Sequence, residues 1–214
     1  MALRKLFWDD PYLTQTPATV TSVDGPVVTL DRTVAYAFAG GQASDTGTIG
    51  GCEILEARTS GQEILYTLPD DHGLASGDEV LVRIDWDRRY RIMRLHFAAE
   101  LVLELVNQFY GRPPKIGANV TAEKARVDFA WDGSIAEVLP RLQMELERLV
   151  AEDLPIVSAF ADEGEQRRYW EIEGFARVAC GGTHLGSTGE VGAVTLRRDN
   201  IGRGKERIEI RLAG

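Results

Sequence analysis

Cysteine and histidine are scarce in this chain of 214 residues, which holds two cysteines and three histidines. Two cysteines are too few for a disulfide framework, so the composition favours a reducing compartment and we expect a cytoplasmic protein. No apolar run approaches the roughly 20 residues that a helix needs to cross a bilayer, so we expect no membrane segment. The N-terminal stretch turns acidic at Asp9 and Asp10 before an apolar run can form, which is not typical of a secretion signal.

Positive charge is also in deficit, since 24 Lys and Arg face 33 Asp and Glu, a net charge of −9. This balance argues against a protein that coats nucleic acid with a basic surface. The cations are clustered, however, and a local cluster can still contact phosphate. One cluster is Arg88, Arg89, Arg91 and Arg94, and the other is Arg197, Arg198, Arg203, Lys205, Arg207 and Arg211. Taken alone, each cluster is better explained as a solvated face.

Residues 1–85 are predicted to form a small β-barrel-like domain. Apolar and polar residues alternate over Ala18–Val23, Asp24-Gly25 indicates a turn, and Val27–Leu30 returns as the next strand. Further strands are expected at Glu53–Ala57, Glu63–Leu68 and Glu79–Asp85. Many short strands separated by glycines are typical of a small barrel or a curled sheet.

Residues 86–214 are predicted to form an α/β domain, which makes the chain α+β as a whole. Apolar residues recur at helical spacing between Tyr90 and Tyr110. A second helix is expected at about Leu139–Glu152, with Pro140 in its first turn, where a missing N–H costs nothing. Strands are expected at Ala125–Ala130, Tyr169–Glu173, Phe175–Ala179, Gly192–Arg197 and Arg207–Leu212.

Two pairs of residues offer metal-type ligands in this second part. His96 and Glu100 lie four apart on the first predicted helix, so both side chains project from one face. Cys180 and His184 are also four apart, with two glycines between them that permit a tight turn. Nitrogen, oxygen and sulfur donors together suit tetrahedral zinc. The spacing alone leaves a metal site and a plain core or surface pair equally acceptable.

Three sequence blocks carry a family resemblance. They are Asp31–Ile49, which contains Gly40-Gly41-Gln42, then Asp85–Glu100, and then Cys180–Gly192, which begins Cys-Gly-Gly-Thr-His. In this order they resemble the alanyl-tRNA editing proteins, often called AlaX, and the editing region of alanyl-tRNA synthetase. The resemblance extends from about Trp8 to Leu212.

The resemblance implies a fold and an activity. Such proteins join a small β-barrel to an α/β zinc-binding editing domain and work in trans. They hydrolyse the ester of a wrongly charged tRNA, chiefly seryl-tRNA(Ala), and hold Zn²⁺ through an H-x-x-x-H helix and a C-x-x-x-H loop. His96, Cys180 and His184 match three of those ligands. A class II synthetase core does not fit in 214 residues, so we do not expect aminoacylation.

Glu100 stands where the family has its second helical histidine. Three interpretations are open: Glu100 ligates zinc through a carboxylate oxygen, it acts as a general base beside a zinc with three protein ligands, or the site is degenerate. We favour ligation. A carboxylate in place of an imidazole lowers the net charge of the centre from +1 to 0, so the metal would polarise water less.

The resemblance also nominates Thr33 and Gln42 as candidate catalytic residues, and the general-base interpretation adds Glu100. Thr33 matches the family's pocket threonine, and Gln42 ends the Gly-Gly-Gln block that approaches the ester. The tRNA contacts expected are Arg88, Arg89, Arg91, Arg94, Arg203 and Lys205. The expected partner is tRNA(Ala) charged with a wrong amino acid. A non-catalytic, zinc-stabilised module that binds tRNA or protein, and hydrolysis of another aminoacyl ester, are the alternatives.

Overall fold

The computed structural model describes residues 3–213 and contains mostly strands, with two α-helices. The chain divides into two compact units. The first runs from the N-terminus to Ala39 and from Ala43 to Tyr90, and the second comprises Gly40–Gln42 and Arg91 to the C-terminus. The Gly-Gly-Gln loop, expected in the β-rich part, therefore groups with the second unit. Neither α-helix of the described chain is long and apolar enough to cross a membrane.

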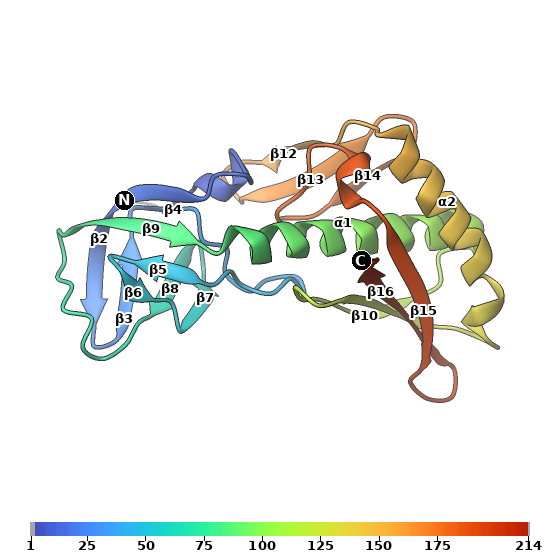
Figure 1. Ribbon diagram of the computed structural model, residues 1–214, viewed down its shortest axis with the longest axis horizontal. Coiled ribbons are helices and arrows are strands. Elements are labelled where there is room, and N and C mark those ends of the chain that lie inside the picture. Colours follow the sequence, from blue (N-terminus) through green and yellow to red (C-terminus); the bar gives the residue numbers. More distant parts are fainter. Residues whose placement is uncertain (1–2, 214) are drawn as a thin grey trace. The chain divides into compact units, whose positions relative to one another are not determined.

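The first unit is built around one curled antiparallel sheet of seven strands, in the order β6-β5-β9-β2-β3-β8-β7 (Figure 1). Asp24 pairs with Val27 across the β2–β3 hairpin, so Gly25 and Pro26 form its turn. Gly25 adopts a φ of 55°, which a side chain would strain. The strands are β2 (Gln15–Asp24), β3 (Val27–Leu30), β5 (Gly47–Ile49), β6 (Cys52–Glu53), β7 (Glu56–Ser60), β8 (Glu63–Thr67) and β9 (Glu79–Ile84). A further pair, β1 (Arg4–Lys5) and β4 (Arg32–Thr33), is parallel, and a 3₁₀ turn, η1, covers Leu6–Trp8.

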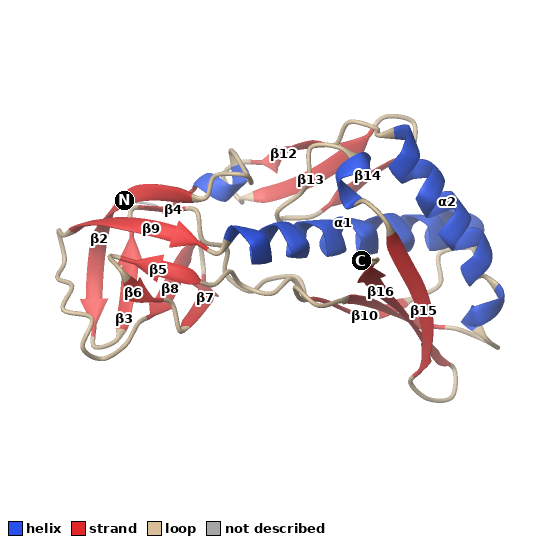
Figure 2. Ribbon diagram, in the orientation of Figure 1, coloured by secondary structure: helices blue, strands red, loops and turns tan. Residues whose placement is uncertain are grey.

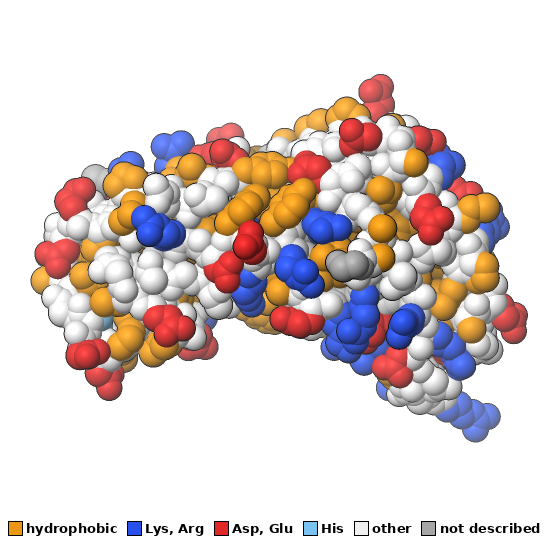
Figure 3. All heavy atoms as spheres, in the orientation of Figure 1, with side chains coloured by type: hydrophobic (Ala, Val, Ile, Leu, Met, Phe, Trp, Pro, Cys, Tyr) orange, Lys and Arg blue, Asp and Glu red, His pale blue; other side chains and the backbone are white. Residues whose placement is uncertain are grey.

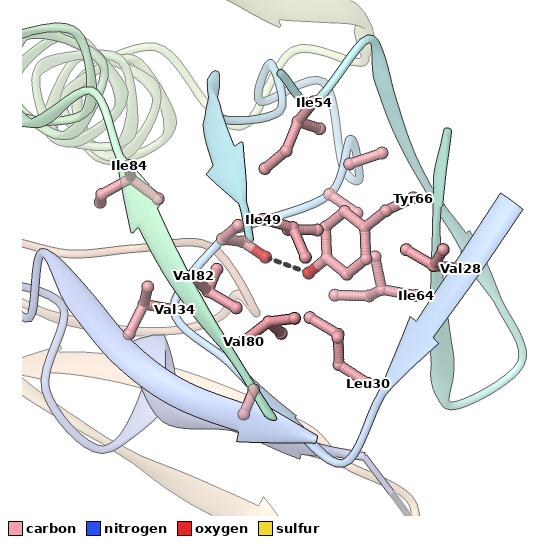
Figure 4. Packing of buried hydrophobic residues seen from close by; sticks show 14 of the residues in the cluster. Val28, Leu30, Val34, Ile49, Ile54, Ile64, Tyr66, Val80, Val82 and Ile84 are labelled. Carbon is pink, nitrogen blue, oxygen red and sulfur yellow. Dashed lines mark hydrogen bonds between the residues drawn. The ribbon is translucent and has the colours of Figure 1, made fainter. Parts of the chain in front are cut away.

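Alternate residues of these strands form the core of the first unit (Figure 4). Val28, Leu30, Ile49 and Val82 are at most 1% exposed. Tyr66 lies among them with its ring fully buried, and its hydroxyl donates to the carbonyl of Ala35 at 2.8 Å. The alternation visible in the sequence therefore marks the buried face of this sheet.

The second unit contains two antiparallel sheets and both α-helices. One sheet has the order β10-β11-β16-β15 and the other β12-β13-β14. Its helices are α1, which continues from the first unit, and α2, with 3₁₀ turns η2 and η3 between the larger elements. The bounds are α1 (Trp86–Phe109), β10 (Lys115–Val120), β11 (Ala125–Ala130), η2 (Ile135–Glu137), α2 (Leu139–Glu152), β12 (Val157–Asp162), β13 (Arg167–Ile172), β14 (Ala176–Ala179), η3 (Thr188–Val191), β15 (Val194–Asn200) and β16 (Lys205–Leu212).

Helix α1 runs between the two sheets of the second unit (Figure 2). Its Phe97 ring packs edge-on against Trp170 of β13 at 5.2 Å, and Arg91 donates to the carbonyl of Ala122 beside β11. Burial on both sides explains why Leu101 and Val102, neighbours that point in different directions, are both fully buried. The helix thus holds His96 and Glu100 in the interior of this unit.

The mixed α and β class with a curled sheet confirms the coarse prediction. Leu139–Glu152 is found as helix α2 with Pro140 in its first turn, as expected. Strands β10 and β12 were not predicted, because the sequences of both lack regular alternation and their residues are largely exposed or half-buried. The predicted strand Glu53–Ala57 is wrong as one element, since β6 ends at Glu53 and β7 begins at Glu56.

Candidate metal centre

Helix α1 contributes the first two side chains of the centre. His96 is 7% exposed and Glu100 half-buried, one helical turn apart. The Nε2 atom of His96 lies 3.3 Å from Oε1 of Glu100. The other carboxylate oxygen accepts a hydrogen bond from Trp170 Nε1, also at 3.3 Å. The indole of β13 therefore fixes the carboxylate beside the histidine.

The loop after β14 brings Cys180 and His184 to the same place. The amide of Cys180 donates to the carbonyl of Arg168, which extends the β13–β14 pairing by one residue. A Cβ at Gly182 would collide with the imidazole of His96, so only glycine lets the loop pass this close to α1. One donor atom from each of His96, Cys180 and His184 lies within 4.8 Å of the others. The predicted convergence of helix and loop is therefore present in the geometry, and Glu100 lies beside this group of three.

Both imidazoles have a polar partner at Nδ1, and Nε2 of His96 lies beside Cys180 and Glu100, so Nε2 is the nitrogen that each ring could offer to a metal. Nδ1 of His96 lies 3.3 Å from the carbonyl of Thr183, to which it can only donate. Nδ1 of His184 lies 2.9 Å from the hydroxyl of Ser158. Nε2 of His184 is buried and has no hydrogen-bond partner. A buried nitrogen in this state is costly unless something binds it.

The electrostatics of the cluster favour a cation at its centre. Burial lowers the pKa of His96, but the charges and hydrogen bonds of Cys180 and Glu100 outweigh burial and raise it well above its usual value. Burial raises the pKa of Glu100, yet the hydrogen bond and charge of His96 bring it down to about 2. Burial and the neighbouring charge of His96 lower the pKa of His184 to about 3, which keeps that imidazole neutral. The groups that hold a proton on His96 are those that would hold a metal ion.

Two donor distances at His96 match those between ligands of one zinc ion. Tetrahedral Zn²⁺, with bonds of about 2.3 Å to sulfur and about 2.05 Å to nitrogen, places those two atoms about 3.6 Å apart. The same geometry separates a nitrogen from a carboxylate oxygen by about 3.4 Å. Sγ of Cys180 lies 3.6 Å from Nε2 of His96, and Oε1 of Glu100 lies 3.3 Å from the same nitrogen. These pairs have the spacing of ligands on one ion.

Gln42 holds the ligand loop in place. Its side chain is 2% exposed, and both the oxygen and the nitrogen of its amide group form hydrogen bonds with Thr183. Oε1 accepts from the Thr183 amide at 3.2 Å, and Nε2 donates to the Thr183 hydroxyl at 2.9 Å. The loop of Gln42 is itself fixed to β10, because the amide of Val120 donates to the carbonyl of Gly41 at 2.8 Å. The structure thus brings Gln42 together with the loop that carries Cys180 and His184.

Thr33 lies in the first unit and is fully buried there. Its hydroxyl accepts from the amide of Ala35 at 3.0 Å and shares a 2.8 Å hydrogen bond with Tyr66. The phenol of Tyr66 donates to the Ala35 carbonyl, so the threonine donates to the phenol. The donor of Thr33 and one of its two acceptor lone pairs are therefore used inside the core.

The arginines predicted to contact tRNA differ in their surroundings. Arg89 is fully buried and forms an ion pair with Asp45, so the prediction that it contacts phosphate is wrong: its guanidinium belongs to the core of the first unit. Arg88 and Arg94 are half-buried, and they donate to the carbonyls of Ser44 and Val191. The exposed members of the predicted set are Arg91, Arg203 and Lys205.

Comparison with known proteins gives a consistent result. Residues 169–209 match the second additional domain of threonyl and alanyl tRNA synthetases. The alanyl-tRNA editing protein AlaX-M of Pyrococcus horikoshii is 31% identical over 98% of this chain and 97% of its own length. The chain belongs to the AlaX-M family of alanyl-tRNA editing proteins. AlaX-M of Methanosarcina barkeri is likewise 31% identical, over 97% of this chain and 98% of its own. The alanine–tRNA ligase of Ignicoccus hospitalis is 35% identical over 90% of this chain, which spans 24% of that larger protein.

Three residues of this AlaX-M site were not found from the sequence. Trp170 holds Glu100, Thr183 contacts both Gln42 and His96, and Ser158 contacts His184. Thr183 stood in the predicted loop between two ligands, so its place in the motif was a usable signal. Trp170 and Ser158 lie on strands distant in sequence from the metal-type residues, and no local pattern connects them to the site.

Proposed function

We propose that this AlaX-M protein hydrolyses, in trans, the ester of tRNA(Ala) charged with a wrong amino acid, with serine as the main substrate. The convergence of His96, Cys180 and His184 carries this proposal, together with the names of the relatives, which describe alanyl-tRNA editing. A cytoplasmic location belongs to the proposal, since two unpaired cysteines and a tRNA substrate fit that compartment.

His96, Cys180 and His184 are the residues that would hold Zn²⁺, and Glu100 would supply a fourth donor. Zinc bound there would supply Lewis acidity toward an ester carbonyl or a water molecule. Trp170 keeps one oxygen of Glu100 occupied and leaves the other facing His96. Gln42 holds the cysteine and histidine loop by way of Thr183, so we assign Gln42 to positioning of the ligands.

Serine differs from alanine by one hydroxyl, which an apolar synthetase pocket cannot reject strongly. A second, hydrolytic site gains selectivity when it hydrogen-bonds that hydroxyl, because alanine then leaves its polar groups unpaired. The family resemblance assigns this task to Thr33. In this structure the hydroxyl of Thr33 could meet the substrate with its remaining acceptor lone pair, or as a donor by exchanging its bond with Tyr66 for one with the substrate.

Exposed cations of the second unit are the proposed phosphate contacts. Figure 3 shows Lys and Arg side chains gathered over β15 and β16. Arg203 and Lys205, at the turn between these strands, form no ion pair within residues 3–213, unlike Arg198, which binds Glu206. Arg91 is exposed as well. If these side chains bind tRNA, its affinity should fall steeply with salt.

One observation favours a second candidate function. A centre of Zn²⁺, one thiolate, one carboxylate and two neutral imidazoles has no net charge, which weakens Lewis acidity relative to a centre with three imidazoles. The alternative is therefore a zinc-stabilised module of the same fold that binds tRNA or protein without catalysis.

Incubation of the purified protein with seryl-tRNA(Ala) and alanyl-tRNA(Ala), with zinc content read from the same sample, tests the proposal. We expect fast loss of serine, slow loss of alanine, and loss of activity after chelation. Glu100→His should restore the family's ligand set and retain zinc, while Glu100→Ala should bind zinc at least about 10-fold more weakly. Zinc at full occupancy without deacylation of either substrate would favour the non-catalytic module. Unchanged zinc affinity in Glu100→Ala would remove Glu100 from the ligands and leave it as a base.

A further inference from the structure

Ser158 lies on β12, outside every motif that identified the site. Its hydroxyl is 2.9 Å from Nδ1 of His184, and the residue is exposed. His184 itself is 3% exposed and packed against the rings of His96 and Phe97. The contact therefore joins a surface side chain of an edge strand to the most enclosed of the three metal-type residues.

The backbone sets this contact. The ligand loop continues past His184 along the start of β12, where the amide of Ile156 donates to the carbonyl of Gly186 at 2.9 Å. Pro155 and Ser187 form an antiparallel bridge in the same register. In an antiparallel pairing, the residue two positions after Ile156 lies opposite the residue two positions before Gly186. Those positions are Ser158 and His184, so their proximity follows from the pairing of the main chain.

A neutral imidazole carries its one proton on either Nδ1 or Nε2, and the partner of one nitrogen decides the state of the other. A hydroxyl that accepts from Nδ1 places the proton there and leaves the lone pair on Nε2. Nε2 of His184 is the buried atom without a partner, so the lone pair would lie on the nitrogen that is available to bind an ion. His96 shows the same arrangement, with Nδ1 directed at the carbonyl of Thr183.

We infer that Ser158 is a positioning residue for the metal centre: its hydroxyl accepts the Nδ1 proton of His184 and so presents Nε2 to the ion. This inference rests on the proposed zinc centre but not on the proposed substrate. Partners of this kind orient a ligating histidine, and their loss typically weakens metal binding 10- to 100-fold.

The experiment compares Ser158→Ala with Ser158→Thr and with a control, Ser76→Ala. Ser76 is also exposed, and its hydroxyl donates to the carbonyl of Thr21 at 3.0 Å in the first unit. Zinc affinity is measured by competition with a chromophoric chelator. We expect Ser158→Ala to bind zinc at least about 10-fold more weakly. Ser158→Thr keeps the hydroxyl on a strand-favouring residue and should stay close to the parent, as should Ser76→Ala.

A second readout is independent of metal and of activity. In the metal-free protein, long-range ¹H–¹⁵N spectra of the imidazoles show which nitrogen of His184 carries the proton. We expect the Nδ1–H form in the parent and in Ser158→Thr, and a shift toward Nε2–H in Ser158→Ala. An Nε2–H form in the parent, or equal zinc affinity of Ser158→Ala and the parent, would overturn the inference. If the parent bound no zinc, the metal part of the proposed function would fail, while the tautomer would still decide the role of Ser158.

Discussion

Both units of this protein bury polar side chains, but one buried atom of the second unit lacks the partner that the buried pairs of the first unit have. In the first unit, Arg89 and Asp45 form a buried ion pair, and Thr33 and Tyr66 satisfy each other's hydroxyls. In the second, His184 is equally buried and keeps an Nε2 atom without a partner. A buried polar group is therefore not itself a sign of function. The sign is a buried polar group that lacks a hydrogen-bond partner, since buried polar groups with a purely structural role are nearly always hydrogen-bonded.

The largest effect on the free energy of unfolding should follow from breaking the ion pair between Arg89 and Asp45 in the first unit. Asp45 also accepts from the amide of Tyr36 at 2.7 Å, and Arg89 donates to the carbonyl of Val34 at 2.7 Å. Asp45→Asn leaves a buried guanidinium without its counter-charge, so we expect the free energy of unfolding to fall by about 3–5 kcal/mol. Chemical denaturation of the metal-free protein measures it.

The matched control is Asp9→Asn. Asp9 binds Arg4 at 3.0 Å with both side chains largely exposed, and such pairs contribute about 0–1 kcal/mol. If Asp45→Asn cost no more than Asp9→Asn, the claim that the first unit closes its buried polar groups for stability would be wrong.

A smaller effect is expected from Thr33→Val, which keeps the shape of the side chain and removes the hydroxyl. The amide of Ala35 and the oxygen of Tyr66 then lose a partner inside the core, so we expect the free energy of unfolding to fall by about 1–3 kcal/mol. Thr33→Ser retains the hydroxyl and should keep most of that stability. The ratio of seryl- to alanyl-tRNA(Ala) hydrolysis, measured on both variants, separates the two roles: a lower ratio in Thr33→Val supports substrate recognition, and an unchanged ratio assigns Thr33 to the core.

Local patterns in the sequence predicted the helices and strands that depend on the spacing of neighbouring residues. Helix α2 and strands β3 and β11 were predicted with the bounds that they have, because periodicity and turn residues act over a few positions. The pairing of His96 with Cys180 came from motifs matched to a family, since 84 residues separate them and no periodicity links them. The sequence did not reveal that Arg89 turns inward to Asp45, because a cluster of arginines looks the same whether its members are solvated or one is buried.

The residues that were missed share a physical cause. Ser158 and Trp170 face each other in the register of β12 and β13, and each contacts a different metal-type residue. Their roles depend on which strand lies next to α1 and to the ligand loop. That arrangement is fixed by packing across the second unit. The sequence around a serine or a tryptophan in a strand does not indicate such a contact.

The smallest effect on stability should come from His184 itself, and this tests the comparison most directly. His184→Leu removes a buried Nε2 atom that has no partner, which should stabilise the fold. It also removes the hydrogen bond to Ser158, which should destabilise it by a similar amount. In the presence of a chelator, we therefore expect the free energy of unfolding to stay within about 1 kcal/mol of the parent. Leu185→Ala, at a neighbouring position that is 2% exposed, is the control and should cost about 2–5 kcal/mol. With zinc at 100 times its dissociation constant, the parent should gain about 2.7 kcal/mol, and His184→Leu much less. A loss above 2 kcal/mol for His184→Leu in chelator would show that this histidine is held for the fold, and the contrast between the two units would then disappear.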